Sequence, residues 1–315
     1  MFEFGKNINL VLAADDNYAQ HLGVALASII DNYHDDRFLV FHILDNGISG
    51  KNKECLKIIG NSKQTRIIFY EIAQDLLVDC YEINHISRAG YARFLIPELL
   101  PSNISKVLYL DSDIVVLKDI TELYDQELGH FPLGAVADVM AKEILRIYFY
   151  PGLSNYFNSG VLLINLDYWR QENIKKKAWD FMRRYRKDII RPDQDILNCL
   201  FNNNWKVLDN RFNVDLKRKS FMVMPGSDTV VLHYSDRIKP WQYLFTRSSS
   251  YYYFVYLKKT PWGDFKFKDK NLKNFFKKYY LLSMKELKRI LLPFVPLSLL
   301  DNYRRLLWRT YEMKK

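Results

Sequence analysis

Residues 106–116 constrain the fold of this chain more than any other stretch. An apolar run rich in β-branched and aromatic residues leads into Asp111-Ser112-Asp113, and a second apolar run follows. In an extended chain, residues i and i+2 point to the same side, so Asp111 and Asp113 can direct both carboxylates at one cation. Two like charges beside a hydrophobic core repel each other unless a cation or hydrogen-bond donors compensate. We therefore expect a strand that delivers the pair to the carboxyl edge of a sheet, where open α/β folds bind ligands.

A solvated turn between two strands is the alternative explanation of this pair, because short motifs also arise by chance. Asp193-Gln194-Asp195 has the same spacing. Pro192 and the acids after it are typical of the first turn of a helix. For Asp193 and Asp195, a helix start and a functional role therefore both remain open.

Apolar segments with the periods of strands and helices alternate along most of the chain. This alternation predicts an α/β fold in which helices cover both faces of a mostly parallel central sheet. The expected strands are residues 9–18 (ending in a polar loop), 38–44, 66–71 and 133–138, with 156–165 as a loop entering another strand, and the expected helices are residues 19–32, 51–60, 87–100, 167–185 and a short one from Pro192.

Length and cysteine usage bound the class of protein. The 315 residues are 49% hydrophobic, with only 12 Gly and 10 Pro, which is enough for one large globular domain and an appendage. Cys55, Cys80 and Cys199 are odd in number and widely spaced, which favours a reduced cytoplasmic compartment. The apolar stretch 8–14 is interrupted by Asn9 and is not typical of a signal peptide. No segment reaches the roughly 18 apolar residues that a bilayer span needs.

The basic charge is concentrated at the C-terminus. Residues 258–315 hold 16 Lys and Arg against 5 Asp and Glu, a net charge of +11, which leaves −1 for the rest of the chain. We therefore divide the chain into a near-neutral main domain, residues 1–244, and a basic, mainly helical appendage, residues 245–315.

The appendage interleaves basic residues with aromatic and leucine residues, as in residues 275–282 and 303–309. This pattern is typical of short helices that lie in a membrane interface, where each basic residue near anionic lipid adds about 1 kcal/mol. Residues 290–300 are apolar but contain two prolines and are too short to span. A solvated basic face on an ordinary helical subdomain is the alternative. Nucleic-acid binding is a weaker alternative, because the near-neutral rest of the chain offers no groove of positive charge.

Residues 229–241 form a second chemical centre. A hydrophobic strand delivers His233, and Lys239-Pro240-Trp241 follows six residues later. An isolated histidine after a strand is often a hydrogen-bonded core residue. An imidazole would equally complete a two-carboxylate site suited to Mn²⁺, and Lys239 could neutralise a phosphate. Two further polar residues are candidates: Asn158, which precedes small residues that let a ligand approach the backbone, and Arg93, for which a surface cation is the simpler role.

Six segments occur together in the order in which one known family carries them. They are residues 13–18, 85–87 with 91–93, 107–113, 157–165, 193–198, and His233 with 239–241. This set resembles the family 8 retaining glycosyltransferases, which include bacterial lipooligosaccharide galactosyltransferases and lipopolysaccharide glucosyltransferases. The resemblance spans about residues 7–241 and implies a GT-A fold, a nucleotide-diphospho-sugar donor and a Mn²⁺ ion, with Mg²⁺ as a substitute.

Position by position, the resemblance assigns the site residues. It implies that Asp111, Asp113 and His233 bind the metal, which would act as a Lewis acid on the departing UDP. It implies that Asp15, Asn17 and Tyr18 hold the uracil and ribose, and that Lys239 binds phosphate. Ala13 and Ser112 belong to the same donor site. Arg93, Asn158, Asp193 and Gln194 match residues around the donor sugar and the reacting centre.

Two mechanisms of retention are open at this stage. Gln194 would lie on the β face of the anomeric carbon and is a poor nucleophile because it is neutral. Asp195 is the nearby carboxylate in sequence that could attack covalently. We favour front-face transfer, in which the leaving phosphate activates the acceptor hydroxyl, and double displacement through Asp195 is the alternative.

One position departs from the family. A glycine commonly stands three residues after the histidine, beside the diphosphate, and this chain has Asp236. Because a carboxylate facing phosphate is repulsive, we expect Asp236 to turn outward, to pair with Arg237, or to shift the loop.

The sequence thus predicts a bacterial, Mn²⁺-dependent hexosyltransferase that uses UDP-galactose or UDP-glucose at the inner face of the plasma membrane. The expected acceptor is a lipopolysaccharide-type or other membrane-linked glycan. The alternatives are an enzyme that extends O-glycans on a bacterial surface protein, and a non-catalytic membrane-docking protein with a vestigial donor pocket. Metal-dependent phosphodiester hydrolysis normally needs more metal-binding His and Asp than this sequence offers.

Overall fold

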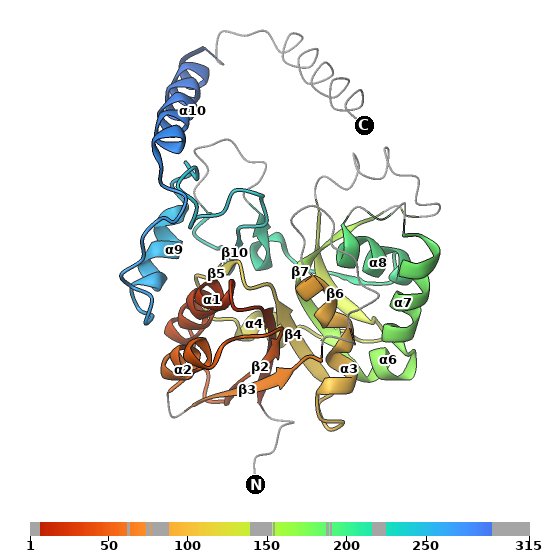
Figure 1. Cartoon of the computed structure of the whole chain (residues 1–315). Helices are drawn as coiled ribbons and strands as arrows, with labels where there is room; N and C mark the ends of the chain where they lie inside the picture. Colours follow the sequence, from red (N-terminus) through yellow and green to blue (C-terminus); the bar gives the residue numbers. More distant parts are fainter. Residues whose placement is uncertain are drawn as a thin grey trace.

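The structure is a computed structural model, which describes residues 7–61, 64–73, 76, 88–138, 153, 155–186, 189, 191–215 and 225–291. Within these ranges, a seven-stranded sheet has the order β3-β2-β1-β4-β7-β6-β8, and β5-β10-β9 form a smaller sheet (Figure 1). The strands are β1 Ile8–Ala14, β2 Leu39–Asp45, β3 Thr65–Glu71, β4 Lys106–Leu110, β5 Ile114–Val116, β6 Leu133–Ala137, β7 Phe157–Asn165, β8 Lys206–Val207, β9 Val214–Asp215 and β10 Val231–His233.

The pairing of the strands confirms the mostly parallel sheet. Strand β1 pairs parallel with β2 and β4, and β2 pairs parallel with β3. Strand β7 runs antiparallel to both of its neighbours, β4 and β6. Because β7 is reversed, its first residues lie at the edge where β1 and β4 end, and the Asp111 N–H donates to the Gly160 carbonyl at 2.8 Å. The topology therefore gathers the ends of β1 and β4 and the start of β7 at one edge.

Helices cover both faces of the large sheet. Alternate residues of β1 serve opposite cores: Leu10 and Leu12 pack with α1, α2 and α4, whereas Val11 and Ala13 pack with η3, α3 and α6–α8. This is the two-residue period of a strand buried on both faces. The helices are α1 Ala19–Asp31, α2 Gly50–Ile59, the 3₁₀ helix η3 Arg88–Leu95, α3 Ile96–Leu99, α4 Thr121–Tyr124, α6 Leu166–Gln171, α7 Ile174–Arg184, α8 Pro192–Phe201, the 3₁₀ helix η4 Asn210–Phe212, α9 Ser250–Leu257 and α10 Leu272–Leu291.

The structure corrects three sequence expectations for local structure. The single helix expected at 167–185 is two helices, because Asn173 adopts a left-handed conformation (φ 49°) and its side chain caps α7. The helix expected at 87–100 is a 3₁₀ helix followed by a short α-helix with Pro97 in its first turn; residue 87 lies outside the described ranges. The strand expected after a loop at 156–165 already begins at Phe157, so Asn158 lies within β7.

The segment after residue 245 packs against the body of the protein. Tyr253, Tyr256 and Leu257 of α9 share a hydrophobic cluster with Val24 of α1 and Leu232 of β10. The Tyr253 hydroxyl lies 2.7 Å from Nδ1 of His21, and Asn32 donates to the Tyr256 hydroxyl at 2.7 Å. Trp262 lies against Gly23, where an added Cβ would meet its ring at 2.5 Å. Helix α9 is thus anchored to α1.

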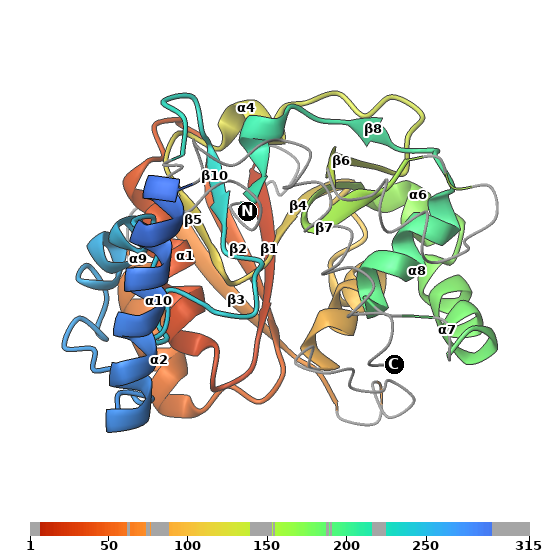
Figure 2. The ribbon, with the colours of Figure 1, turned by 90° about the horizontal axis from the view of Figure 1, so that it is seen from above.

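Helix α10 stands at one side of the molecule and extends away from the sheet (Figures 1 and 2). Its exposed apolar residues are Leu272, Phe275, Phe276, Tyr279, Tyr280, Leu287 and Ile290. None of the helices in the described ranges has the length and apolar character to cross a membrane. Residues 292–315, which contain the 303–309 segment and most of 290–300, lie outside the described residues.

Candidate active site

A pocket of about 480 Å³ opens at the sheet edge where β1 and β4 end. That volume is in the usual range for small-molecule sites. Residues from six places line it: the end of β1 with the loop after it (residues 13–15, 17 and 18), η3 (Gly90 and Arg93), the β4–β5 turn with Tyr109, the start of β7 (residues 158–160), the start of α8, and the end of β10 with the loop after it. Every site residue expected from the sequence lines this pocket except Asp195.

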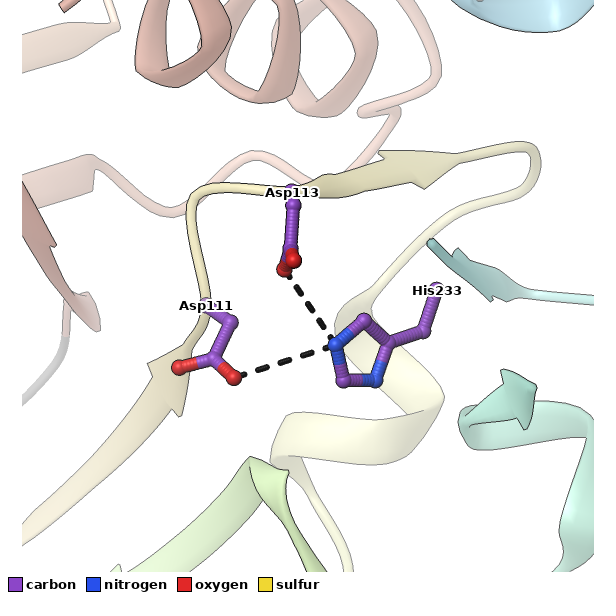
Figure 3. Close-up of side chains that lie close together, drawn as sticks. All are labelled: Asp111, Asp113 and His233. Atoms are coloured by element: carbon purple, nitrogen blue, oxygen red, sulfur yellow. Dashed lines mark ion pairs between the residues drawn. The ribbon is translucent and has the colours of Figure 1, made fainter. Parts of the chain in front are cut away.

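The two acids and the histidine converge as the sequence predicted. Asp111 follows β4, Asp113 precedes β5, and His233 ends β10, which pairs antiparallel with β5 so that His233 lies opposite Ile114. Nε2 of His233 lies 3.2 Å from Oδ1 of Asp113 and 3.7 Å from Oδ2 of Asp111 (Figure 3). One potential ligand atom from each residue lies within 4.8 Å of the others. The three side chains can therefore share one cation.

The surroundings of these three residues fit a divalent cation. Among the described residues, Oδ1 of Asp113 is buried and has no hydrogen-bond donor. A Cβ on Gly160 would lie 2.2 Å from Cε1 of His233 and 2.7 Å from Oδ2 of Asp111, so only a residue without a side chain fits beneath the cluster. Two carboxylates and one imidazole are a donor set that suits Mn²⁺ and other hard to borderline divalent ions.

Arg93 is buried, so the simpler interpretation of this residue as a surface cation is wrong. Its side chain is 3% exposed and lies 3.0 Å from Asp111 and 2.9 Å from Asp193. It also donates to the Ser159 carbonyl at 2.5 Å and lies over the ring of Tyr109. Burial works against its charge, but these neighbouring acids raise the pKa of Arg93 above its ordinary value. A 3₁₀ helix that packs against the sheet turns this cation inward.

The two metal-ligand candidates Asp111 and Asp113 differ in their electrostatic surroundings. Burial raises the pKa of Asp111, although Arg93 opposes this shift. Burial also disfavours the charge of Asp113, but Lys239 and His233 together hold its pKa well below the ordinary value. The Lys239 ammonium lies 2.6 Å from Oδ2 of Asp113 and donates to the Tyr234 carbonyl at 2.7 Å. The Lys239-Pro240-Trp241 turn thus brings the Lys239 cation to the rim of the cluster formed by Asp111, Asp113 and His233.

The three polar residues at the start of α8 face different ways. Asp193 accepts from the Ser159 hydroxyl at 2.7 Å, and Gln194 accepts from the Ser159 N–H at 3.2 Å. Asp195 is 1% exposed and does not line the pocket. It accepts from the Tyr156 hydroxyl and from the Arg191 N–H. Successive residues of a helix are rotated by about 100° around its axis. Asp193 and Gln194 therefore face Ser159 of β7, whereas Asp195 faces Tyr156 and Arg191.

The loop after β1 forms the other end of the pocket. Asp15 caps its turn by accepting from the Tyr18 N–H at 2.9 Å. The Tyr18 ring lies edge-on to His21 and Trp241, which stack with ring centres 3.5 Å apart. The expected donor-site residues Ala13 and Asn17 line the pocket here.

Ser112 ties this end of the pocket to the metal-ligand cluster. Its hydroxyl donates to the Ala13 carbonyl at 2.6 Å, which fixes the β4–β5 turn to the end of β1.

Asp236 finds a partner that the sequence did not suggest. Its carboxylate lies 2.6 Å from the guanidinium of Arg247, while its other oxygen accepts from the Arg237 N–H. Of the three expected alternatives, pairing with Arg237 occurs only through its backbone N–H, and the ion pair of Asp236 is with Arg247, eleven positions later. This pairing neutralises the acid that stands beside the Lys239 turn.

Sequence reasoning missed three residues that the fold brings to the site. Arg191 lines the pocket and lies 2.9 Å from Asp138, which follows β6. The sheet-edge rule could have indicated Asp138, because it ends a predicted strand. Asn213 contacts both His233 and Asn158. It belongs to no motif, so only the tertiary structure could reveal it.

Comparisons with known proteins agree with this site. Residues 9–244 match the family described as Glycosyl transferase family 8. General stress protein A of Bacillus subtilis is 30% identical over 271 residues, which cover 81% of this chain and 95% of that protein. Lipopolysaccharide 1,3-galactosyltransferase of Salmonella typhimurium is 29% identical over 268 residues, which cover 81% and 79%.

Among solved structures, galactosyltransferase LgtC in complex with donor and acceptor sugar analogs is 31% identical, with a TM-score of 0.72. The alignment covers 81% of this chain and 96% of that one. This likeness confirms the expected GT-A fold. The family match and the shared fold together show that the chain belongs to glycosyltransferase family 8.

Proposed function

We propose that this protein is a metal-dependent, retaining hexosyltransferase that moves galactose or glucose from a UDP-sugar to a glycan acceptor. One observation carries the proposal: Asp111, Asp113 and His233 meet beside a pocket that also holds Lys239 and the loop after β1. The family includes a lipopolysaccharide galactosyltransferase and a lipopolysaccharide glucosyltransferase among the named relatives. The likeness to LgtC, which was solved with donor and acceptor sugar analogs, supports the same reading of the pocket.

The residues of the pocket divide the donor between them in this proposal. Tyr18, Asp15 and Asn17 hold the uracil and ribose at the β1 end, and Lys239 takes one charge of the diphosphate. Asp111, Asp113 and His233 hold Mn²⁺, or Mg²⁺ in its place. A divalent ion there supplies Lewis-acid stabilisation of the negative charge on the leaving UDP. His233 and Lys239 are buried, and the low-dielectric surroundings make their contributions larger than they would be in water.

The sugar end of the donor is held by Arg93, Asp193 and Asn158. Asp193 is fixed by Arg93 and by the Ser159 hydroxyl, so its carboxylate is available as a rigid acceptor for a sugar hydroxyl. Arg93 supplies the compensating charge for both Asp111 and Asp193. Such a set of preoriented groups lowers the barrier by holding the sugar in a reactive geometry.

Front-face transfer is the mechanism that the site supports best. Gln194 lines the pocket and is neutral, whereas Asp195 lies outside the lining and is engaged by Tyr156 and Arg191. A covalent intermediate would need Asp195 to leave both partners. In front-face transfer, the acceptor hydroxyl attacks the anomeric carbon from the side of the departing UDP and gives its proton to the phosphate oxygen.

The direct test is release of UDP from a panel of UDP-sugars, with and without Mn²⁺, by the wild type and Asp113→Asn. We expect Mn²⁺-dependent hydrolysis of one UDP-hexose by the wild type and loss of it in the variant, with circular dichroism unchanged. Full activity of Asp113→Asn in Mn²⁺ would contradict the metal assignment. A wild type that hydrolyses none of the donors would favour the vestigial-pocket alternative.

The acceptor is proposed to be membrane-linked, at the inner face of the plasma membrane, because of helix α10. Leu272, Phe276, Tyr280, Leu287 and Ile290 recur at helical spacing, so they form one apolar stripe along α10. Phe276 is 64% exposed and Tyr280 is 63% exposed. The region from residue 258 onward carries the net charge of +11. An exposed apolar stripe on a strongly basic segment suits an anionic lipid surface. We keep residues 245–315 as the membrane-association region and 1–244 as the catalytic domain.

Sedimentation with vesicles tests the membrane assignment. The double variant Phe276→Ser, Tyr280→Ser should lose most binding to vesicles that contain phosphatidylglycerol, while its hydrolysis of the donor in solution stays unchanged. A charge-preserving control, Lys175→Arg on helix α7, should bind as the wild type does. Equal sedimentation of the double variant and the wild type would refute the role of α10.

A further inference from the structure

Asn213 contacts two groups that have different tasks in the proposed site. Its Oδ1 lies 3.0 Å from Nδ1 of His233, and its Nδ2 donates to Oδ1 of Asn158 at 2.9 Å. The side chain is 5% exposed. The imidazole of His233, which is proposed to bind the metal, and the amide of Asn158, which is proposed to bind the donor sugar, therefore both contact the buried Asn213 side chain.

The orientation of each amide follows from a backbone group that cannot reverse. The Gly160 N–H donates to Oδ1 of Asn158 at 2.9 Å. Because that atom of Asn158 must be the oxygen, the atom of Asn213 that faces it must be the NH₂ donor. The Asn213 oxygen then faces His233, and an oxygen can only accept. The hydrogen-bond chain from Gly160 outward thus fixes both amides.

This chain also sets the tautomer of His233. Since Nδ1 donates its proton to Asn213, Nε2 is the nitrogen that offers a lone pair in the neutral ring, which is the form of His233 that a cation would bind. Nε2 is the atom that faces Oδ1 of Asp113 and Oδ2 of Asp111. Partners of this kind orient metal-binding histidines and raise their affinity for the ion.

The fold holds Asn213 in place for this role. It follows the 3₁₀ helix η4 and precedes β9, which pairs parallel with β10 so that Asp215 lies opposite His233. Its own N–H donates to the Asn210 carbonyl at 3.2 Å. Backbone pairing, and not side-chain flexibility, therefore brings Asn213 beside the imidazole.

We infer that Asn213 is a positioning residue for glycosyl transfer, which holds His233 in its metal-binding tautomer and leaves the Asn158 NH₂ free to bind a sugar oxygen. This inference rests on the proposed function. Asn158 lines the pocket, and both N–H donors to its oxygen are already protein groups. The amide nitrogen is then the atom of Asn158 that remains for the donor sugar.

Two variants separate the two arms of this contact. Asn213→Leu removes both hydrogen bonds, and we expect Mn²⁺ affinity, measured from free Mn²⁺ by electron paramagnetic resonance, to fall about 10- to 100-fold. Asn213→Asp keeps an acceptor for Nδ1 of His233 but sets a carboxylate oxygen against Oδ1 of Asn158. It should keep Mn²⁺ affinity near the wild-type value and still lose kcat for hydrolysis of the UDP-hexose that the wild type accepts.

Asn32→Leu is the matched control. Asn32 is an amide with three structural hydrogen bonds, to Ser28, Val116 and Tyr256. Its loss should lower the melting temperature and leave Mn²⁺ affinity unchanged. If the wild type is active and folded Asn213→Leu binds Mn²⁺ as tightly as the wild type does, the inference about Asn213 is wrong, whereas the proposed function stands. If Asn213→Leu does not fold, wild-type kcat in Asn213→Asp would overturn the Asn158 arm. A wild type without Mn²⁺ binding or hydrolysis would instead refute the proposed function.

Discussion

Replacing Gly160 by alanine places one methyl group directly under the metal-ligand cluster. The added Cβ would lie 2.2 Å from Cε1 of His233 and 2.7 Å from Oδ2 of Asp111. Carbon atoms are in ordinary contact at about 3.5 Å, so the imidazole must move by about 1 Å. The backbone cannot yield easily, because the Gly160 carbonyl accepts from the Asp111 N–H and its N–H donates to Asn158.

The magnitude follows from these distances. A misplacement of about 1 Å at a reacting site can cost about 100-fold in rate, and overpacking a buried site costs about 1–3 kcal/mol of stability. We therefore expect Gly160→Ala to lower the rate of donor hydrolysis by about 100-fold and to weaken Mn²⁺ binding. The assays are UDP release at saturating donor and Mn²⁺ titration followed by electron paramagnetic resonance.

A second sheet glycine provides the control. The three atoms nearest to a Cβ on Gly134 of β6 belong to the side chains of Leu128 and Leu208, at 3.1–3.3 Å. Gly134→Ala should therefore lose some stability without weakening Mn²⁺ binding. If Gly160→Ala binds Mn²⁺ and hydrolyses donor as the wild type does, Gly160 does not shape the metal site and the geometric reasoning is wrong.

Two further predictions concern buried polar groups. Burial lowers the pKa of His42 from 6.5 to about 4, so the unfolded chain takes up the proton first as the pH falls. Unfolding free energy should therefore drop by about 2 kcal/mol between pH 7 and pH 5 on account of this residue. Urea titrations at both pH values should show that the unfolding free energy of His42→Gln falls by about 2 kcal/mol less than that of the wild type. An equal fall in both proteins would contradict this prediction. Asp195→Asn disturbs one or two buried hydrogen bonds, so we expect donor hydrolysis to fall only on the order of tenfold; complete loss, with a glycosyl adduct on Asp195 of the wild type in mass spectra, would favour double displacement.

Much of the fold could be predicted because its signals are local. The alternating periods gave β1, β2, β3, β6 and the helices α1, α2 and α8 close to their bounds. The convergence of Asp111, Asp113 and His233 was also predictable in kind, because Asp111 and Asp113 follow a buried strand and His233 ends another. Each inference needed only a few neighbouring residues and the rule that strand ends meet at one sheet edge.

The break between α6 and α7 was not predictable in the same way. A continuous amphipathic pattern runs through residues 167–185, yet Asn173 takes a left-handed conformation. The packing of buried residues such as Trp169 and Ile174 against the core easily overrides about a few kcal/mol of helix propensity. Tertiary contacts decided where the helix ends.

The sequence by itself determined which chemical groups this protein has and, through two-residue and 3.6-residue periods, most of the elements that carry them. The tertiary structure alone decided which groups touch: Lys239 reaches Asp113 across 126 positions, Arg93 is buried between Asp111 and Asp193, and Asp195 turns away from the pocket. The physical reason is that burial, charge pairing and hydrogen-bond satisfaction depend on neighbours in space. A short stretch of chain does not contain those neighbours.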